Sequence, residues 1–189
     1  MERNYRLTDE TIIFNNRTLY RIEATKDFAD IKKGDKGGFI EKYENLCDNA
    51  WVYDNAKIYG NAEVYGNARV YGNAKVYGDA KVYGHAIVYG EARVFRDAEV
   101  YGYAEIFGEA IVFGDAIIHS TNDYCTFSNF GSENRTTTFF KSKEGILVAC
   151  GCFKGTIEEF KEKVKETHKG NKHEREYLKM IELVEIKFE

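Results

Sequence analysis

Proline is absent from this chain of 189 residues, where average usage would give about nine. Proline has no backbone N–H and a fixed φ, so it is excluded from strands in which every N–H joins a hydrogen-bond ladder. Its absence, beside 17 glycines and 14 tyrosines, rules out a proline-rich linker protein and a collagen-like chain.

Cysteines and long apolar runs are scarce as well. Four cysteines are too few for a disulfide scaffold, and no apolar run approaches the roughly 18 residues of a membrane span. The segment from Met1 to Arg6 is charged and lacks the apolar core of a signal peptide. With 31% charged and 43% apolar residues, the composition is not that of a disordered chain. We therefore expect a soluble protein of a reducing compartment, the cytoplasm.

A six-residue repeat dominates the middle of the chain. Residues 48–119 form twelve consecutive hexads, with Ala at the third place and Val or Ile at the fifth place of every one. Tyr or Phe fills the sixth place in eleven hexads, and His119 is the exception. Uninterrupted repetition of this kind predicts a solenoid.

Strand alternation explains each place in the hexad. In Ala-x-Val-Tyr, Ala and Val point to one side, which must be the interior, while x and the aromatic point outward. The following Gly-Asn or Gly-Asp pair suits a corner, because these residues tolerate positive φ. Three hexads then make one triangular coil, so the twelve hexads predict four coils in a prism about 19 Å tall.

The spacing resembles that of hexapeptide-repeat proteins, which fold as left-handed β-helices with an aliphatic residue at i and a small one at i+4. Val52 with Ala56 and Ile58 with Ala62 follow this rule. The aromatic at i+1 departs from the family pattern. The resemblance implies a mainly β fold, a single-stranded left-handed parallel β-helix of about four triangular coils.

The flanks are expected to cover the open ends of the solenoid. Residues 1–47 predict an N-terminal β cap, in which Thr11–Phe14 and Thr18–Ile22 form a hairpin around Asn15-Asn16. The glycines of Lys33–Ile40 predict a turn-rich approach to the first coil.

Residues 120–189 predict a C-terminal ββαα module. Its strands are Thr136–Lys141 and Ile146–Cys150, and a capping box at Thr156 and Glu159 opens the first helix. A second helix is predicted over Glu174–Glu185. The inward side chains expected on the two helices are Ile157, Phe160 and Val164, then Tyr177, Leu178, Ile181 and Val184.

Charge is unevenly distributed among the three parts. The net charge of −4 lies entirely on residues 48–119, because each flank has equal numbers of acidic and basic residues. An acidic repeat argues against direct, sequence-specific nucleic-acid binding, which needs a basic footprint. The one basic column is Lys57, Lys75 and Arg93, which we interpret first as a solvated face.

The outward aromatic columns are the other candidate surface. Their stacking would stabilise parallel rungs, and wide aromatic faces could also bind a protein or a second copy. The candidate contact residues are Tyr71, Tyr89, Phe107, Lys57, Lys75 and Arg93.

Few residues of the sequence are arranged as a catalytic or metal-binding site would require. Some hexapeptide-repeat proteins are acyltransferases with a histidine base, and His85 and His119 are the histidines of the repeat. We expect a corner residue and a coil terminator there, since the repeat has no inserted loop. Zinc binding through three histidines between subunits is disfavoured by having only these two. Cys150-Gly151-Cys152 places two thiols on one side of a strand, but C-x-C is not the usual zinc spacing, even with His168 and His173. We therefore expect no enzyme activity, metal or cofactor.

Two stretches together resemble phage and prophage accessory proteins. They are the Asn-Ala-x-Val-Tyr-Gly hexads behind Tyr5–Glu10, and Thr136–Phe160 with its Cys-Gly-Cys-Phe run. This resemblance implies a non-catalytic protein of the bacterial cytoplasm that binds and blocks a host protein, such as a CRISPR-type defence nuclease or its nucleoprotein complex. An acyltransferase-like enzyme and a self-assembling homo-oligomer are the alternatives.

Overall fold

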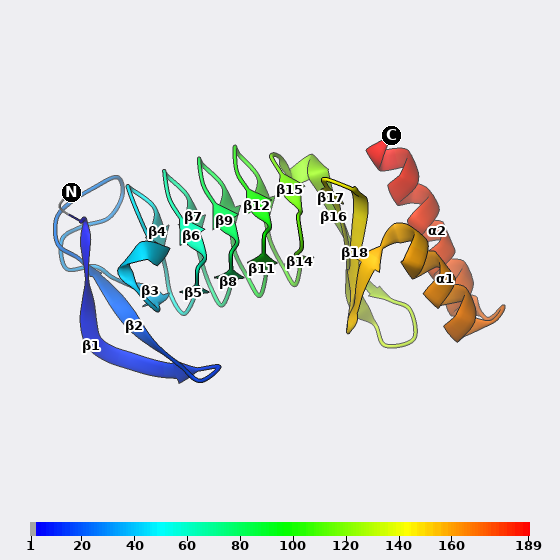
Figure 1. Cartoon of the computed structure of the whole chain (residues 1–189), viewed down its shortest axis with the longest axis horizontal. Helices are drawn as coiled ribbons and strands as arrows, with labels where there is room; N and C mark the ends of the chain where they lie inside the picture. Colours follow the sequence, from blue (N-terminus) through cyan, green and yellow to red (C-terminus); the bar gives the residue numbers. More distant parts are fainter. Residues whose placement is uncertain (1–2) are drawn as a thin grey trace.

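A computed structural model describes residues 3–189. The molecule is elongated, with an N-terminal sheet, a stack of coils and a C-terminal sheet with two helices arranged in line (Figure 1). This arrangement confirms the mainly β fold with a cap at each end of a solenoid.

Three parallel sheets form the faces of the solenoid, and paired residues lie 18 positions apart, as in Lys57 beside Lys75 and Val76 beside Val94. Face 1 contains β5 (Lys57–Gly60), β8 (Lys75–Gly78), β11 (Arg93–Arg96) and β14 (Ile111–Val112). Face 2 contains β6 (Glu63–Val64), β9 (Lys81–Val82), β12 (Glu99–Val100) and β15 (Ile117–Ile118). Face 3 contains β4 (Trp51–Val52), β7 (Arg69–Val70), β10 (Ile87–Val88) and β13 (Glu105–Ile106). The four predicted coils are confirmed, and the left-handed sense stays a prediction.

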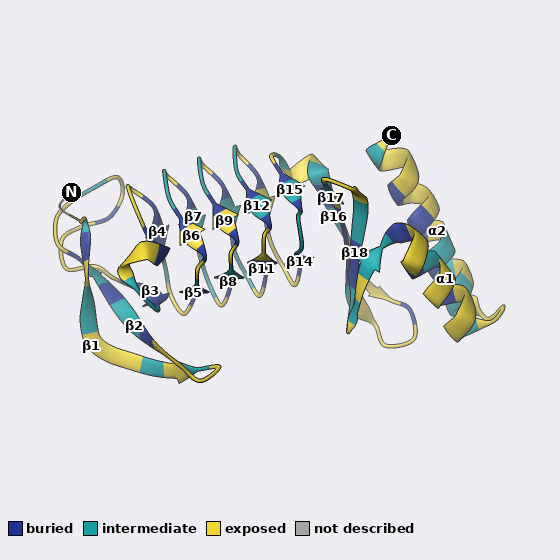
Figure 2. Ribbon diagram, in the orientation of Figure 1, coloured by how far each residue is buried: buried dark blue, intermediate teal, exposed yellow. Residues whose placement is uncertain are grey.

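The interior of the coils is built from two columns of the repeat, the alanines of the third place and the Val or Ile residues of the fifth place. All the hexad alanines, and all the Val and Ile residues at the fifth place, are at most 2% exposed, and buried residues recur in every coil (Figure 2). The sixth-place rings stack between coils, as in Tyr77 on Phe95 at 4.8 Å between centroids. Stacking of the rings thus accompanies the ladder of backbone hydrogen bonds, as the repeat predicts.

The corners between faces require a left-handed backbone. Gly84 has φ +71°, and a Cβ there would lie 3.1 Å from the backbone nitrogen of Gly102 in the next coil. Arg96 takes the glycine place of its hexad and has φ 62°. A residue with a Cβ is sterically strained in the left-handed region. Glycine is therefore the favoured residue at this place of the hexad, and Arg96 is less favourable there.

Replacing Arg96 with glycine should therefore raise the free energy of unfolding by about 0.5–1 kcal/mol, because it relieves the left-handed strain. Gly84→Ala should lower it by a similar amount or more, because strain and close contact are both introduced. Urea unfolding of the two variants measures the difference. A loss of stability in both variants would contradict this account of the corners.

The N-terminal cap is a hairpin that continues into face 1. β1 (Tyr5–Phe14) pairs with β2 (Arg17–Ala24), and Asn15 and Asn16 both have positive φ, as a primed hairpin turn requires. β2 pairs with β3 (Lys36–Ile40), which pairs with β5 in parallel. A short 3-10 turn, η1 (Tyr43–Asn45), follows β3. The coil register thus begins upstream of residue 48, with Phe39 beside Lys57 and Leu46 beside Val64.

The expected turn at Lys33–Ile40 is only partly present. Gly34 is a turn glycine with φ +93°, whereas Gly37 and Gly38 are buried in β3. A Cβ on Gly37 would lie 2.5 Å from the Ile22 side chain, and one on Gly38 would lie 2.6 Å from the carbonyl oxygen of Ala56. These glycines permit close approach of the cap to the first coil, which is why the prediction of a turn there was wrong.

The C-terminal module is a four-stranded antiparallel sheet covered by two helices. After η2 (Thr121–Asp123), its elements are β16 (Tyr124–Phe130), β17 (Arg135–Ser142), β18 (Gly145–Cys150), β19 (Phe153–Thr156), α1 (Ile157–His168) and α2 (Lys172–Phe188). The predicted strands, capping box and helices are confirmed, and β16 and β19 flank them. On α2, the expected Leu178 is half-buried and packs against the core of the module, and Met180 is a further buried residue.

The sheet of this module separates two cores. Phe140 and Tyr124 belong to the core of the solenoid, while Phe139 and Val148 pack with the helices. The module therefore closes the last coil, as a solenoid end requires.

Candidate protein-binding face

The candidate contact residues lie on two faces that meet at one corner. Tyr71, Tyr89 and Phe107 follow the strands of face 3, and the basic column lies on face 1. Between Tyr89 and Arg93 the chain makes only the corner at Gly90, Glu91 and Ala92. The two sets are thus adjacent but point in different directions.

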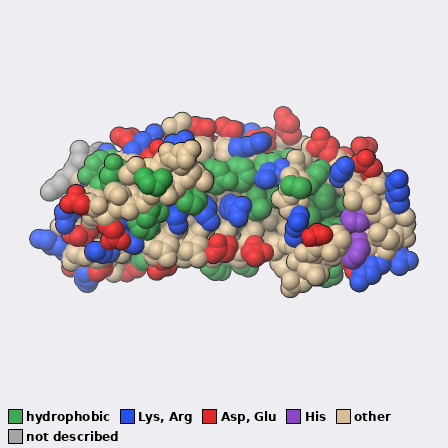
Figure 3. All heavy atoms as spheres, turned by 90° about the horizontal axis from the view of Figure 1, so that it is seen from below, with side chains coloured by type: hydrophobic (Ala, Val, Ile, Leu, Met, Phe, Trp, Pro, Cys, Tyr) green, Lys and Arg blue, Asp and Glu red, His purple; other side chains and the backbone are tan. Residues whose placement is uncertain are grey.

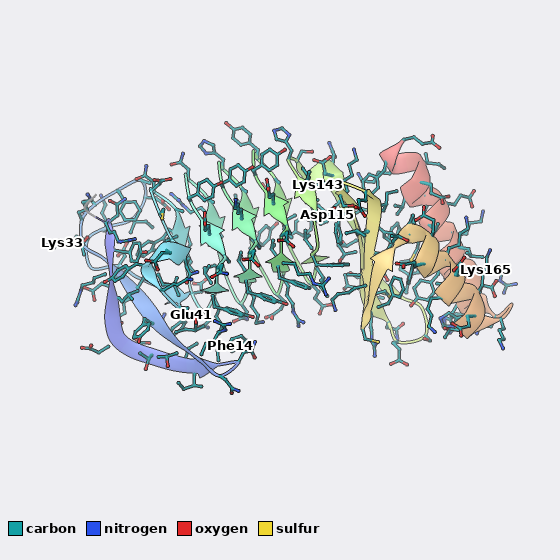
Figure 4. All side chains as sticks on the ribbon, viewed as in Figure 1. Phe14, Lys33, Glu41, Asp115, Lys143 and Lys165 are labelled. Carbon is teal, nitrogen blue, oxygen red and sulfur yellow. The ribbon has the colours of Figure 1, made fainter. Side chains whose placement is uncertain are left out.

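Two of the three basic side chains in this column, Lys57 and Lys75, already contact groups within the protein. The Lys57 amine donates to the backbone carbonyl of Asn55 at 2.8 Å and lies 5.4 Å from the centre of the Phe14 ring at the hairpin tip (Figure 4). Burial, helped by the charge of Lys75, lowers the pKa of Lys57. Lys75 lies 3.9 Å from a carboxylate oxygen of Glu91. This column is therefore a partly neutralised face.

Arg93 is the exposed member of the column. It lines a groove of about 510 Å³ between face 1 and the C-terminal module, with Glu91, Glu109 and Arg135 in the same wall. The hydroxyl of Thr136 donates to Glu109 at 2.8 Å, and both residues line this groove. Basic and acidic side chains are interspersed on this side of the molecule (Figure 3), which does not form a continuous track for phosphates.

The N-terminal cap covers the first part of face 3. Trp51 stands at the outward place x of its hexad, yet it is only 1% exposed because Phe28 packs on it at 5.6 Å between ring centroids. Asp30 accepts a hydrogen bond from the Tyr53 hydroxyl at 3.0 Å and forms an ion pair with Arg69 at 3.2 Å. Burial and the bond to Asp30 raise the pKa of Tyr53. The outward place of Trp51 is therefore covered by the cap and closed to solvent.

The far end of the face 3 aromatic column is partly open. Tyr71 is half-buried and stacks on Tyr53 at 4.2 Å, whereas Phe107 is 39% exposed and stacks on Tyr89 at 5.5 Å. Across the strands of the last two coils, Tyr103 is 75% exposed and stacks on His85 at 5.0 Å. Rings project along the corners of the coils in Figure 4.

We call His85, Ile87, Tyr89, Tyr103 and Phe107 the aromatic patch. Ile87 is half-buried on face 3 between the two ring columns. Sequence reasoning missed Tyr103. A signal was present, since Tyr103 is the single aromatic at the second place of the twelve hexads.

The histidines of the repeat are held by aromatic contacts. The His119 ring lies edge-on to Tyr101 at 5.1 Å, and His85 stacks on Tyr103. Among residues 3–189, the one histidine ring with a side-chain hydrogen bond is that of His173, to Glu176 at 3.0 Å. A catalytic histidine base usually has an orienting partner, and neither His85 nor His119 shows one in the described chain.

Cys150 and Cys152 are at the turn between β18 and β19. Gly151 has φ +58°, Cys150 pairs with Phe153, and Cys152 is exposed. Cys150 thus ends β18 and Cys152 lies within the hairpin turn, so the expected place of both thiols on one side of a strand was wrong. Across the part of the chain that is described, no three His, Cys, Asp or Glu side chains are grouped to hold a metal ion.

Comparison with known proteins supports the solenoid. A family model for the YdcK beta solenoid repeat matches residues 62–78. No curated protein matches the chain. In residues 3–189 no helix is long and apolar enough to cross a bilayer.

Proposed function

We propose that this protein is a non-catalytic scaffold that binds another protein through the aromatic patch. The observation that carries the proposal is the contrast along face 3. The cap buries Trp51 and engages Tyr53, while Tyr103 and Phe107 are left open. Exposed large apolar groups that lie together are typical of interaction sites.

The chemistry of the patch suits a protein partner. Tyr is enriched among the residues that dominate binding energy, because its ring buries a large area at a low cost in side-chain entropy. Stacked rings on a ladder of hydrogen-bonded coils are held in place before binding, so little further ordering is needed. Arg93, across the corner from Tyr89, supplies a polar contact at the rim.

The resemblance to phage accessory proteins directs the search for this partner to host proteins. Stoichiometric blocking of a defence nuclease, or of its nucleoprotein complex, is the specific form that we propose. The net charge of −4 on the coils favours contact with protein over contact with nucleic acid.

The double variant Tyr103→Ala, Phe107→Ala should lose partner capture. The full chain serves as bait in a lysate of the host, and captured proteins are identified by mass spectrometry. Calorimetric titration with the purified partner then measures stoichiometry and affinity. Two exposed rings at the centre of an interface predict a loss of at least about tenfold in affinity.

A matched control removes two rings from face 2, in Tyr65→Ala, Tyr101→Ala. Both of these tyrosines are half-buried, and both belong to the column that stacks through Tyr83. The control should keep wild-type affinity for the partner. Equal affinity of the wild type and the patch variant would show that the patch is structural only.

A further inference from the structure

The outer side of the C-terminal module has a second apolar surface. A groove of about 450 Å³ runs between β16 and α2, lined by Phe127, Phe130, Met180 and Leu183 among others. Beside it, Leu183 is 57% exposed and Ile186 is 61% exposed, and much of α2 is exposed at this end of the molecule (Figure 2). This surface is distant in the fold from the N-terminal cap and separate from the aromatic patch.

A strand is a poor occupant for this groove. β16 is an edge strand of its sheet, but its pairing with β17 shifts register between Phe127 and Phe130, and Asn129 has φ 65°. A bulge of this kind bends an edge and interrupts its row of hydrogen-bonding groups. The helical side of the groove is therefore the surface left for a partner.

Charge on the exposed side of α2 has opposite signs at its two ends. Along one stripe the first half carries Lys172, Arg175 and Lys179, and the second half carries Glu182 and Glu189, with Leu183 and Ile186 among them. Steps of three and four residues place these side chains on one stripe of the helix, and the exposed Glu185 and Lys187 lie on the two flanks of this stripe. When two copies of such a stripe are placed antiparallel, the basic half of each lies against the acidic half of the other.

We propose that a second copy of this chain docks its α2 antiparallel against this stripe, across a two-fold axis near residues 180 and 181. Lys179 then lies opposite Glu182 of the partner subunit, and Lys172 lies opposite Glu189 of the partner subunit. Leu183 of each copy covers apolar surface on the other. The contact is isologous and closes as a dimer.

The proposed dimer does not depend on the proposed function, but dimerisation would change how strongly a partner is bound. Two copies joined through their C-terminal modules carry two aromatic patches. A partner that offers two sites would then be held with a gain in avidity. Loss of dimerisation without loss of one-to-one partner affinity would separate the two proposals.

Lys179→Glu is the direct test, with the full chain measured by sedimentation equilibrium over a range of concentrations. The change places a carboxylate at position 179 against Glu182 of the partner subunit twice in each dimer, and like charges at an interface should raise the dimer dissociation constant by about tenfold or more. The reversed pair Lys179→Glu, Glu182→Lys should restore it.

Lys163→Glu on α1 is the matched control. Lys163 forms an exposed ion pair with Glu166 three residues along the helix, as Lys179 does with Glu182, so the net charge and the local helix contacts change equally. This control should leave the dissociation constant unchanged.

Leu183→Glu provides a second variant that should fold, because Leu183 is already exposed to solvent, and it should abolish the dimer. A wild-type chain that stays monomeric at every concentration would overturn the proposal. A dimer insensitive to Lys179→Glu, or one that the reversed pair fails to restore, would also overturn it.

Discussion

Ala80→Leu is expected to lower the free energy of unfolding by about 3 kcal/mol, since added methylenes in a packed core force strain. Ala80 has no exposed surface. Its carbonyl accepts from the Glu63 N–H at 2.9 Å, and the Lys81 N–H donates to Ala98 at 2.9 Å. These bonds hold the coils above and below at a fixed spacing, so the interior cannot expand around a larger side chain.

The neighbouring outward position supplies the control for this prediction. Lys81→Leu introduces the same side chain one residue further along, on the exposed side of face 2, and should change stability by no more than about 0.5 kcal/mol. Urea unfolding of both variants makes the comparison. Equal effects at the two positions would contradict the inward and outward assignment of the hexad.

The solenoid could be predicted from the sequence because each place of its repeat has one local physical cause. Ala80 and Val82 face inward and Lys81 faces outward by strand alternation alone. The half coil before residue 48 does not have the residue types of the hexad repeat. Gly38 stands where the repeat has Ala, and a 3-10 turn replaces one of the corners. The register of this half coil depends on contact with Val52 and Ala56, which no local pattern encodes.

The candidate site was harder to predict for the same reason. Strand alternation places Tyr53 and Phe107 in one outward column, but their surroundings differ. Asp30 of the N-terminal cap engages the first ring, whereas Tyr124 of β16 contacts the second edge-on and leaves it 39% exposed. Likewise Lys75 and Arg93 are equivalent in the repeat, yet only Lys75 has an ion pair with Glu91. Which part of a repeated face is open is decided by contacts between distant segments.

Only two of the four C-terminal strands could be predicted from the sequence. β17 and β18 have apolar runs around a short turn, and both were predicted. β19 spans only Phe153–Thr156, and β16 carries exposed residues at Ser128 and Asn129. Their strand character comes from pairing with β18 and β17, which is a tertiary effect.

Phe140→Ala is expected to lower the free energy of unfolding by about 3–5 kcal/mol, as is typical of a deleted buried ring. Phe140 has no exposed surface and contacts Phe113 edge-on at 5.3 Å, at the end of the face 1 aromatic column. Its loss leaves a cavity between the last coil and the C-terminal sheet. Amide hydrogen exchange should therefore show reduced protection at Arg93 and Glu99 of the third coil, because their N–H groups donate to carbonyls of the last coil.

Phe139→Ala is the matched control, because Phe139 is the adjacent residue, is equally buried and contacts Phe160 of α1 edge-on at 5.9 Å. Its removal should cost a similar free energy, about 3–5 kcal/mol, but the protection lost should be that of the helices. Since the two rings differ only in the side of β17 from which they project, the exchange pattern reports which core each one supports. The same pattern in both variants would mean that the module and the coils open together, and that the sheet does not divide the molecule into two cores.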